Sequence, residues 1–190
     1  MFKLFKRKKL KLKVLRGELA KEFPPLKIAK AGDVAFDIPI AFPYRNGFEK
    51  KVAEYLEDCH DADEEPDMDF INNLKHGTHT INPGERYLAP TDIKIELPKG
   101  HWASIEARSS TSEQSLIVPK GVIDEGYRGE LFAQLINVGK TPVTIHHGDR
   151  LIQLILHERV VEKFEVEDVD RLSESERGET GFGSSGKSVI

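Results

Sequence analysis

From residue 81 onward the chain consists of short β-type segments separated by turn residues, and this pattern limits the possible folds most strongly. The segments rich in aliphatic and aromatic side chains are residues 85–89, 93–97, 102–107, 131–138, 143–145 and 150–156. Proline, glycine, asparagine and aspartate stand between them, as in NPG, PTD and PKG. Many short strands with regular proline and glycine turns are typical of a β-sandwich or jelly roll, not of an α/β sheet.

The N-terminal part fits the same fold class. Lysines alternate with Leu10, Leu12 and Val14, and this period of two predicts a half-buried strand within residues 6–16. A basic arm that binds phosphate or an anionic membrane is the alternative interpretation of these lysines. A further strand is expected within residues 26–40.

Length and composition narrow the protein class. A chain of 190 residues is long enough for one domain with a core, so we expect a single domain over residues 1–190. The net charge of −4 gives no field that selects nucleic acid, and no apolar run could span a bilayer. The single cysteine, Cys59, excludes an internal disulfide and fits a reducing cytoplasm. We therefore expect a cytoplasmic protein without nucleic-acid or membrane partners.

Residues 43–80 interrupt the β pattern. Phe48, Val52 and Tyr55 recur at spacings of three to four, which predicts an amphipathic helix. An acidic run then stops it, and Pro66 is expected to open a second short helix. We expect a helical insertion that packs outside the β structure or binds a protein partner.

Zinc binding by the insertion is an alternative that the sequence favours less. The possible ligands are Cys59, His60, His76 and His79. Their spacing does not match paired C-x-x-C units or another closed structural zinc pattern.

The sequence GVIDEGYRGE (residues 121–130) combines an aliphatic pair, an acid, glycines and an aromatic ring. Apolar residues before Asp124 and after Gly129 predict a β-hairpin with the acid at its bend. Alone, Asp124 is explained as a turn former, because aspartate bonds its own backbone and tolerates tight turns.

Four other motifs change this interpretation. With GVIDEGYRGEL, the chain contains AGDVAFDI (31–38), ARSSTSEQ (107–114), GDRLIQLIL (148–156) and RGETGFGSSG (177–186). Five such motifs in this order resemble the trimeric dUTPases (deoxyuridine triphosphate nucleotidohydrolases). The resemblance implies an all-β fold, a distorted jelly-roll β-barrel with a flexible C-terminal arm at residues 173–190. Residues 43–80 have no counterpart in it.

The implied reaction is the Mg²⁺-dependent hydrolysis of dUTP to dUMP and pyrophosphate, which limits uracil in DNA and supplies dUMP. It needs a base for water, positive charge for the phosphates, and a held nucleoside. By resemblance, Asp124 activates the water and Tyr127 lies under the deoxyribose, where a 2′-hydroxyl would collide with it. Backbone groups of a hairpin at residues 116–121, including Gly121, are expected to read uracil.

The resemblance assigns the phosphate contacts to three other motifs. Arg108, Ser109 and Ser110 would bond phosphate oxygens, although a serine-rich loop alone means little. Gln153 would contribute an amide, although a solvent-facing strand position explains it too. Asp37 would hold the Mg²⁺ shell through water, which fits the few protein ligands that Mg²⁺ uses beside phosphate.

The C-terminal motif implies a lid over the nucleotide. Glycines let the backbone approach an anion closely, and an aromatic ring can stack on a base. The residues that would contact the substrate are Arg177, Phe182, Gly183, Ser184 and Ser185. In the family three subunits build each site, so a homotrimer is implied.

The sequence departs from the family pattern at four positions, which are Ala35, Ser110, Gln114 and Thr180. A dCTP deaminase of the same fold is the nearest alternative, but its acid–base glutamate would be replaced by Gln134 here. Glutamine cannot transfer a proton in that role. A regulatory protein-binding role of residues 43–80, added to dUTP hydrolysis, is the other alternative.

Overall fold

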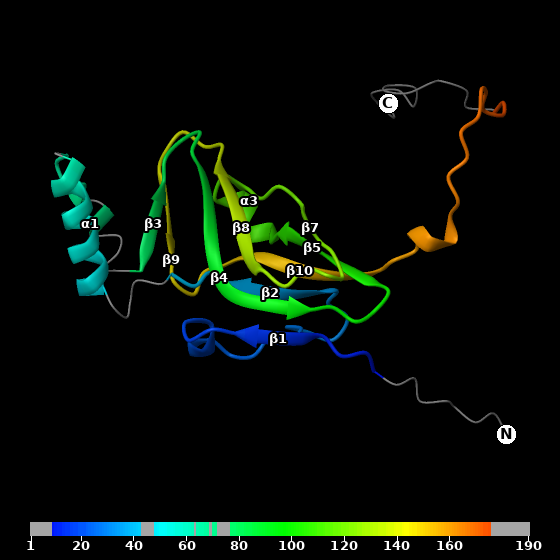
Figure 1. Ribbon diagram of the computed structural model, residues 1–190, viewed down its shortest axis with the longest axis horizontal. Coiled ribbons are helices and arrows are strands. Elements are labelled where there is room, and N and C mark those ends of the chain that lie inside the picture. Colours follow the sequence, from blue (N-terminus) through cyan, green and yellow to red (C-terminus); the bar gives the residue numbers. More distant parts are fainter. Residues whose placement is uncertain (1–8, 43–47, 63, 69, 72–76, 176–190) are drawn as a thin grey trace, which may run out of the picture. The chain divides into compact units, whose positions relative to one another are not determined.

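The computed structural model describes residues 9–42, 48–62, 64–68, 70–71 and 77–175. The chain divides into two compact units, Met1–Arg159 and Val160–Ile190. Antiparallel strands dominate the first unit (Figure 1). In the second unit the described residues are exposed and contain one short 3-10 helix, η2 (Val161–Lys163). The expectation of a single domain over residues 1–190 stays a prediction.

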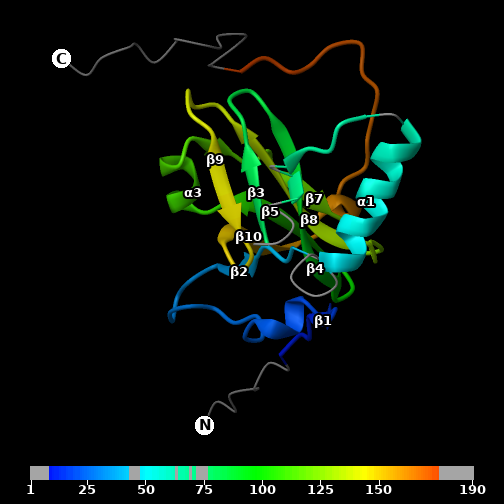
Figure 2. The same cartoon turned by 90° about the vertical axis from the view of Figure 1, so that its left-hand side faces the viewer.

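Within the described residues the β structure consists of two four-stranded sheets and a two-stranded ribbon. The first sheet has the order β1 (Lys13–Arg16), β4 (Arg86–Glu96), β8 (Glu130–Asn137), β6 (Leu116–Ile117). The second has the order β2 (Ala35–Pro39), β10 (Arg150–Glu158), β5 (His101–Ala107), β7 (Gly121–Ile123). The ribbon pairs β3 (Thr78–Ile81) with β9 (Val143–His146), which lie side by side in Figure 2.

Alternate residues of the paired strands form one core. In β8, Leu131, Ala133 and Leu135 are buried, and Ile152 and Leu154 of β10 join the same cluster. Strands present every second side chain to one face, so this alternation places both sheets against a common interior. The all-β jelly-roll prediction is confirmed.

One expected turn is a bulge within a strand. The sequence predicts two strands at residues 85–89 and 93–97, but β4 runs through both and its register shifts between Pro90 and Lys94. Asp92 has a φ of 54°, and the Glu130 carboxylate accepts the N–H groups of Thr91 at 3.0 Å and Asp92 at 2.8 Å. The distant carboxylate satisfies the backbone groups that the bulge leaves unpaired, so the strand continues.

The predicted hairpin at residues 121–130 is wrong. β7 pairs with β5 in the second sheet, whereas β8 pairs with β4 and β6 in the first. The turn after Asp124 therefore carries the chain from one sheet to the other. The same holds for residues 116–121, since β6 and β7 also belong to different sheets. Strand periodicity predicts the strands but not their partners.

The insertion is helical, as expected. The helix α1 (Phe48–Ala62) covers the predicted amphipathic segment. Met68, Phe70 and Ile71 are helical as well, and the rest of the predicted second helix lies outside the described residues. Among the described residues no helix is long and apolar enough to cross a membrane. The short helix α3 (Ser109–Glu113) was not expected.

Candidate active site

One group of candidate residues gathers where β2, β10 and β5 lie side by side. Gln153 of β10 stands opposite Asp37 of β2 on one side and Glu106 of β5 on the other. Arg108 follows β5 directly, and its Nε donates a 2.8 Å hydrogen bond to Asp37 Oδ1. Arg150 Nη1 donates to the other carboxylate oxygen at 3.2 Å. We call Asp37, Arg108, Arg150 and Gln153 the arginine–aspartate group.

This group carries more positive than negative charge. Two guanidinium groups face one carboxylate, and the side chains of Asp37 and Arg108 are only 22% and 28% exposed. Arg108 Nη1 also donates to the backbone carbonyl of Arg150 at 2.8 Å, which fixes the guanidinium plane. A guanidinium held in this way presents fixed donors to an anion such as phosphate.

Further hydrogen bonds to the backbone hold the motif ARSSTSEQ (107–114) in place. Gln153 Nε2 donates to the carbonyl of Ala107 at 2.9 Å, just before Arg108. The hydroxyl of the buried Thr111 donates to the carbonyl of Leu151 at 2.6 Å. Ser109 is exposed at the start of α3, and the Ser110 hydroxyl accepts a long, 3.5 Å contact from Arg108.

A pocket of about 330 Å³ opens beside the arginine–aspartate group. Its walls come from the loop before β2 and from β2 and β10 themselves. The lining residues are Ala29, Gly32, Asp33, Val34, Ala35, Asp37 and Gln153. Among the described residues no cluster of three or more His, Cys, Asp or Glu side chains could form a metal cage.

The carboxylate of Glu106, which stands opposite Gln153, is held ionised. The pKa of Glu106 lies below its usual range, because the Ser104 hydroxyl donates to the carboxylate and Lys120 lies 3.1 Å from it. Ser104 itself is fully buried and also lies 2.9 Å from His157 Nε2. This polar cluster is part of β5 and β10 and stiffens the sheet that carries the site.

The second group of candidate residues is the turn between β7 and β8, residues 124–129, which we call the Asp124 turn. Asp124 is exposed, and its backbone carbonyl accepts the N–H of Tyr127 at 3.0 Å. Glu125 anchors the turn, because its carboxylate accepts the N–H of Gly100 at 2.8 Å and lies 3.3 Å from an Arg159 nitrogen. The sequence analysis missed this anchor, which joins two distant loops.

Tyr127 is fixed although the residue is 41% exposed. Its hydroxyl donates to the carbonyl of Glu130 at 2.8 Å. A Cβ at Gly129 would lie 2.4 Å from that hydroxyl oxygen, so only glycine lets the ring fold back over the turn. Arg128 donates from Nη1 to the carbonyls of Glu125 and Tyr127, both at 2.8 Å. The ring therefore presents one face in a set orientation.

The two groups lie at opposite ends of β5. Ile123 pairs with Ala103, so Asp124 lies near Trp102 at the beginning of that strand, whereas Arg108 follows its last residue. At about 3.3 Å per residue the separation along the strand is about 20 Å. No hydrogen bond or ion pair within the described residues joins the groups. The arginine–aspartate group and the Asp124 turn of one chain therefore cannot both contact the same phosphate group.

Comparison with known proteins decides the family. A family model for dUTPase matches residues 76–186. The chain belongs to the dUTPase family. It is 43% identical over 122 residues to the deoxyuridine 5'-triphosphate nucleotidohydrolase of Caldanaerobacter subterraneus subsp. tengcongensis, covering 63% of this chain and 80% of the relative. The corresponding rabbitpox virus protein is 44% identical over 108 residues, covering 57% of this chain and 72% of the relative.

Solved structures of this family share the fold. The dUTPase of Staphylococcus bacteriophage 80alpha with dUpNHpp superposes with a TM-score of 0.66 at 23% identity, covering 93% of this chain and 98% of the phage chain. A mutant dUTPase from phage phi11 of S. aureus gives 0.60 at 18% identity over 87% of this chain and all of the phage chain, and is described as coordinating a structural Mg(II) ion. At these identities the likeness concerns the fold.

The structure brings together some of the predicted residues and leaves others apart. Arg108 contacts Asp37 and Ser110, Gln153 pairs with Asp37, and Gly121 opens β7 opposite Ile105. Asp124 and Tyr127 form the separate turn. The arm residues Arg177, Phe182, Gly183, Ser184 and Ser185 lie outside the described residues. Arg150, which was not predicted as a site residue, contacts Asp37 of the same chain.

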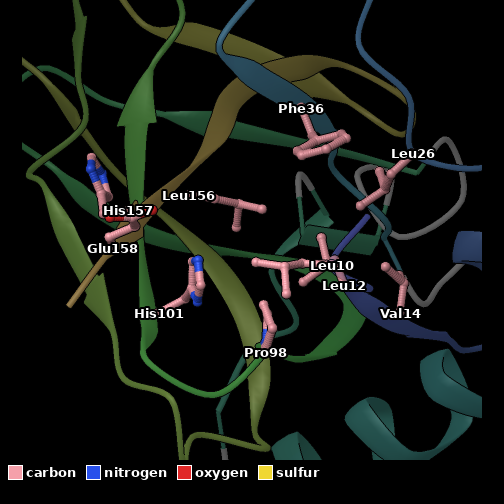
Figure 3. Close-up of a pocket in the computed structure, with 10 residues that line it drawn as sticks. All are labelled: Leu10, Leu12, Val14, Leu26, Phe36, Pro98, His101, Leu156, His157 and Glu158. Carbon is pink, nitrogen blue, oxygen red and sulfur yellow. The ribbon is translucent and has the colours of Figure 1, made fainter. Parts of the chain in front are cut away.

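Another pocket, of about 530 Å³, contains none of the predicted site residues. Apolar side chains of the N-terminal segment, including Leu10 and Leu12, point into it together with Leu156 (Figure 3). Its lining is completed by Val14, Leu26, Phe36, Pro98, His101, His157 and Glu158. The apolar lining offers no set of phosphate ligands, so the arginine–aspartate group remains the candidate nucleotide site.

Proposed function

We propose that this dUTPase-family protein hydrolyses dUTP to dUMP and pyrophosphate. The observation that carries the proposal is the pair of complementary half-sites. One half holds a fixed guanidinium and amide suited to phosphate, and the other presents an exposed carboxylate next to a fixed aromatic ring. The names of the two sequence relatives, both deoxyuridine triphosphate nucleotidohydrolases, support the same substrate.

In the proposed reaction Asp124 orients a water molecule towards the α-phosphorus and accepts its proton. The water oxygen forms a bond to this phosphorus, and the bond from the α-phosphorus to the oxygen bridging to the β-phosphate breaks. Pyrophosphate leaves with that oxygen. The exposed position of Asp124 in a tight turn suits the role, because water and nucleotide can both approach it.

Nucleoside selection follows from the same turn. The Tyr127 ring, held by its hydroxyl bond to Glu130, would lie against the deoxyribose and exclude a 2′-hydroxyl by steric contact. Backbone groups of residues 116–121 would pair with uracil. Cytosine presents the opposite donor and acceptor pattern there and would leave buried groups unpaired, which costs about 1–3 kcal/mol for each group.

The arginine–aspartate group would bind the phosphate chain and its magnesium ion. Bound Mg²⁺ would neutralise phosphate charge during hydrolysis. The surroundings of Asp37 fit binding of Mg²⁺ through a water molecule. Both Asp37 oxygens already accept hydrogen bonds from arginines, yet each keeps a lone pair that a metal-bound water can use. Arg108, Ser109, Ser110 and Gln153 would bond the phosphate oxygens directly.

We further propose that the active site forms between subunits of a homotrimer. The separation of about 20 Å along β5 means that a second chain must bring its Asp124 turn to the arginine–aspartate group. A third chain would supply the arm with Arg177, Phe182, Gly183, Ser184 and Ser185. Closed cyclic assemblies place identical surfaces in such repeated contacts.

Release of pyrophosphate from dUTP, dCTP, dTTP and UTP, measured side by side, tests the proposed function. Strong turnover of dUTP alone is expected, with Asp124→Asn as the inactive control. Equal turnover of all four nucleotides, or full activity of the Asp124→Asn variant, would contradict the proposal.

A measurement of ammonia release from dCTP distinguishes the dCTP deaminase alternative from dUTP hydrolysis. Gln134 is half-buried in β8 opposite Leu88, at the position that the deaminase acid would occupy. An amide accepts no proton there, so no ammonia is expected. Ammonia release at a rate comparable to dUTP hydrolysis would favour the alternative.

We infer a second, protein-binding role for the insertion at residues 43–80. Its described part exposes three apolar side chains, Leu56, Met68 and Phe70, and exposed apolar surface of this kind favours a protein contact. A variant lacking the insertion should keep trimer mass and dUTP turnover. Loss of turnover in a trimer that survives the deletion would instead place the insertion in the active site.

A further inference from the structure

Ser115, the residue before β6, is held in an unusual backbone conformation. Its φ is 61°, in the left-handed region that residues other than glycine rarely adopt. Its N–H donates to the carbonyl of Ser112 at 3.1 Å, and its carbonyl accepts the N–H of Val138 at 3.0 Å. Contacts on both sides therefore stabilise a conformation that this residue would rarely adopt alone.

The turn at residues 137–139 provides the second of these contacts and packs tightly against Ser115. A Cβ placed on Gly139 would lie 2.8 Å from the Cβ of Ser115 and 3.1 Å from its hydroxyl oxygen. The first distance is shorter than real Cβ contacts, so a side chain at 139 would push Ser115 away. Glycine at position 139 is needed for this approach.

Asn137 fixes the turn from inside the fold. It is fully buried, and its Oδ1 accepts the N–H of Gly139 at 2.9 Å. Its Nδ2 donates to the carbonyls of Ile81 at 2.8 Å and Thr141 at 2.9 Å. Because all these contacts are made to backbone groups, the turn has a rigid position relative to β3 and β8.

The segment that begins at Ser115 is the one proposed to read uracil. Leu116 and Ile117 pair with Asn137 and Ile136 immediately after Ser115. The chain then continues through residues 118–120 to β7 and the Asp124 turn. The contact between Gly139 and Ser115 therefore sets where the backbone donors and acceptors of residues 116–121 lie.

We infer that Ser115 and Gly139 are positioning residues for base selection, and that their contact tunes the preference for uracil over cytosine. The inference rests on the proposed function. Neither residue is assigned a contact with the base. Hydrogen bonds weaken steeply once donor and acceptor leave the range of about 2.7–3.2 Å, so a small shift of this backbone reduces base discrimination.

The test is a double-mutant cycle on kcat and KM for dUTP and dCTP. Gly139→Ala should raise KM for dUTP about tenfold and lower the ratio of kcat/KM for dUTP to that for dCTP by a similar factor, the loss of about one base hydrogen bond. Ser115→Gly in the Gly139→Ala background removes the two Ser115 atoms that crowd the new Cβ, including the nearest one, leaves Asn137 Oδ1 at 3.1 Å, and suits the positive φ, so the ratio should return. Lys140→Ala, an exposed change directly after this turn, is the matched control.

The dUTP to dCTP ratio does not depend on the fraction of folded enzyme, so a purely destabilising effect leaves it unchanged. An unchanged ratio in Gly139→Ala, or a lowered ratio that Ser115→Gly fails to restore, overturns the inference.

If Gly139→Ala yields no folded protein, Val138→Pro replaces it. This variant removes the N–H that donates to the Ser115 carbonyl, and the preceding residue, Asn137, lies in a strand, where a residue before proline is tolerated. An unchanged ratio there also overturns the inference. Failure of the wild-type protein to hydrolyse dUTP would instead refute the proposed function.

Discussion

The arginine–aspartate group and the Asp124 turn differ in how much of their structure depends on their own chain. In the first group Asp37, Arg108 and Gln153 bond one another or nearby backbone, and the carboxylate is only 22% exposed. In the second, Asp124 is exposed at the start of its turn, and the side-chain hydrogen bonds come from its neighbours Glu125, Tyr127 and Arg128.

This difference indicates two different tasks. Fixed, partly buried donors suit phosphate, which must be bound in one orientation without reorganisation. A carboxylate on an exposed turn suits a group that is completed by another surface. The comparison therefore predicts that changes in the first group affect both stability and phosphate binding, whereas changes in the second affect catalysis and nucleoside selection with little effect on stability.

The largest effect is expected from Asp124→Asn. Loss of the base should lower kcat by about 10³-fold, within the range that general-base catalysis contributes. The melting temperature should stay within about one degree, because the side chain is exposed and surface changes rarely alter stability. Steady-state kinetics and thermal unfolding measure the two quantities. A melting temperature lowered by several degrees would show that the Asp124 turn also has a structural task.

Asp37→Asn is expected to have the next largest effect and to differ in kind. Two guanidinium groups would lose their carboxylate, which should cost about 1 kcal/mol of stability, the low end of the range for buried groups, because water reaches these partly exposed side chains. The Mg²⁺ concentration for half-maximal activity should rise about 10- to 100-fold. Asp33→Asn, in the same pocket wall, is the control for a nearby charge. Loss of activity without any change in stability or Mg²⁺ dependence would contradict the role of the ion pairs.

Tyr127→Ala should give a smaller and more specific effect. Without the ring, discrimination of dUTP over UTP should fall about 10- to 100-fold, a range typical of steric selection in a pocket. Tyr127→Phe keeps the ring and loses only the bond to the Glu130 carbonyl, so it should retain most discrimination. Equal discrimination in wild-type and Tyr127→Ala proteins would remove the ring from the selection mechanism.

The strands, the helix α1 and the family could be predicted from the sequence. Alternation of apolar residues predicted most of the strands, and the spacing of Phe48, Val52 and Tyr55 predicted α1. The five motifs predicted the family. Local signals of this kind suffice wherever periodicity or turn residues decide the structure.

Contacts between distant segments could not be predicted in the same way. Nothing near Asp92 in the sequence shows that Glu130 would satisfy its bulge, and nothing near Asp124 shows that β7 and β8 join different partners. The bonds of Asp37 to Arg108 and Arg150 likewise depend on the order of strands in the sheet. Such pairings follow from topology, which residue patterns do not specify.

The most direct test of the composite site mixes two inactive variants. Asp124→Asn retains the arginine–aspartate group, and Asp37→Asn retains the Asp124 turn. Each is inactive or weakly active alone, and the two are unfolded and refolded together at equal concentrations. If different chains supply the two groups, about a quarter of the sites in random trimers combine both intact groups, and about a quarter of wild-type dUTP turnover returns. Turnover that stays at the average of the two separate variants, in mixed trimers verified by mass, would contradict a site shared between chains.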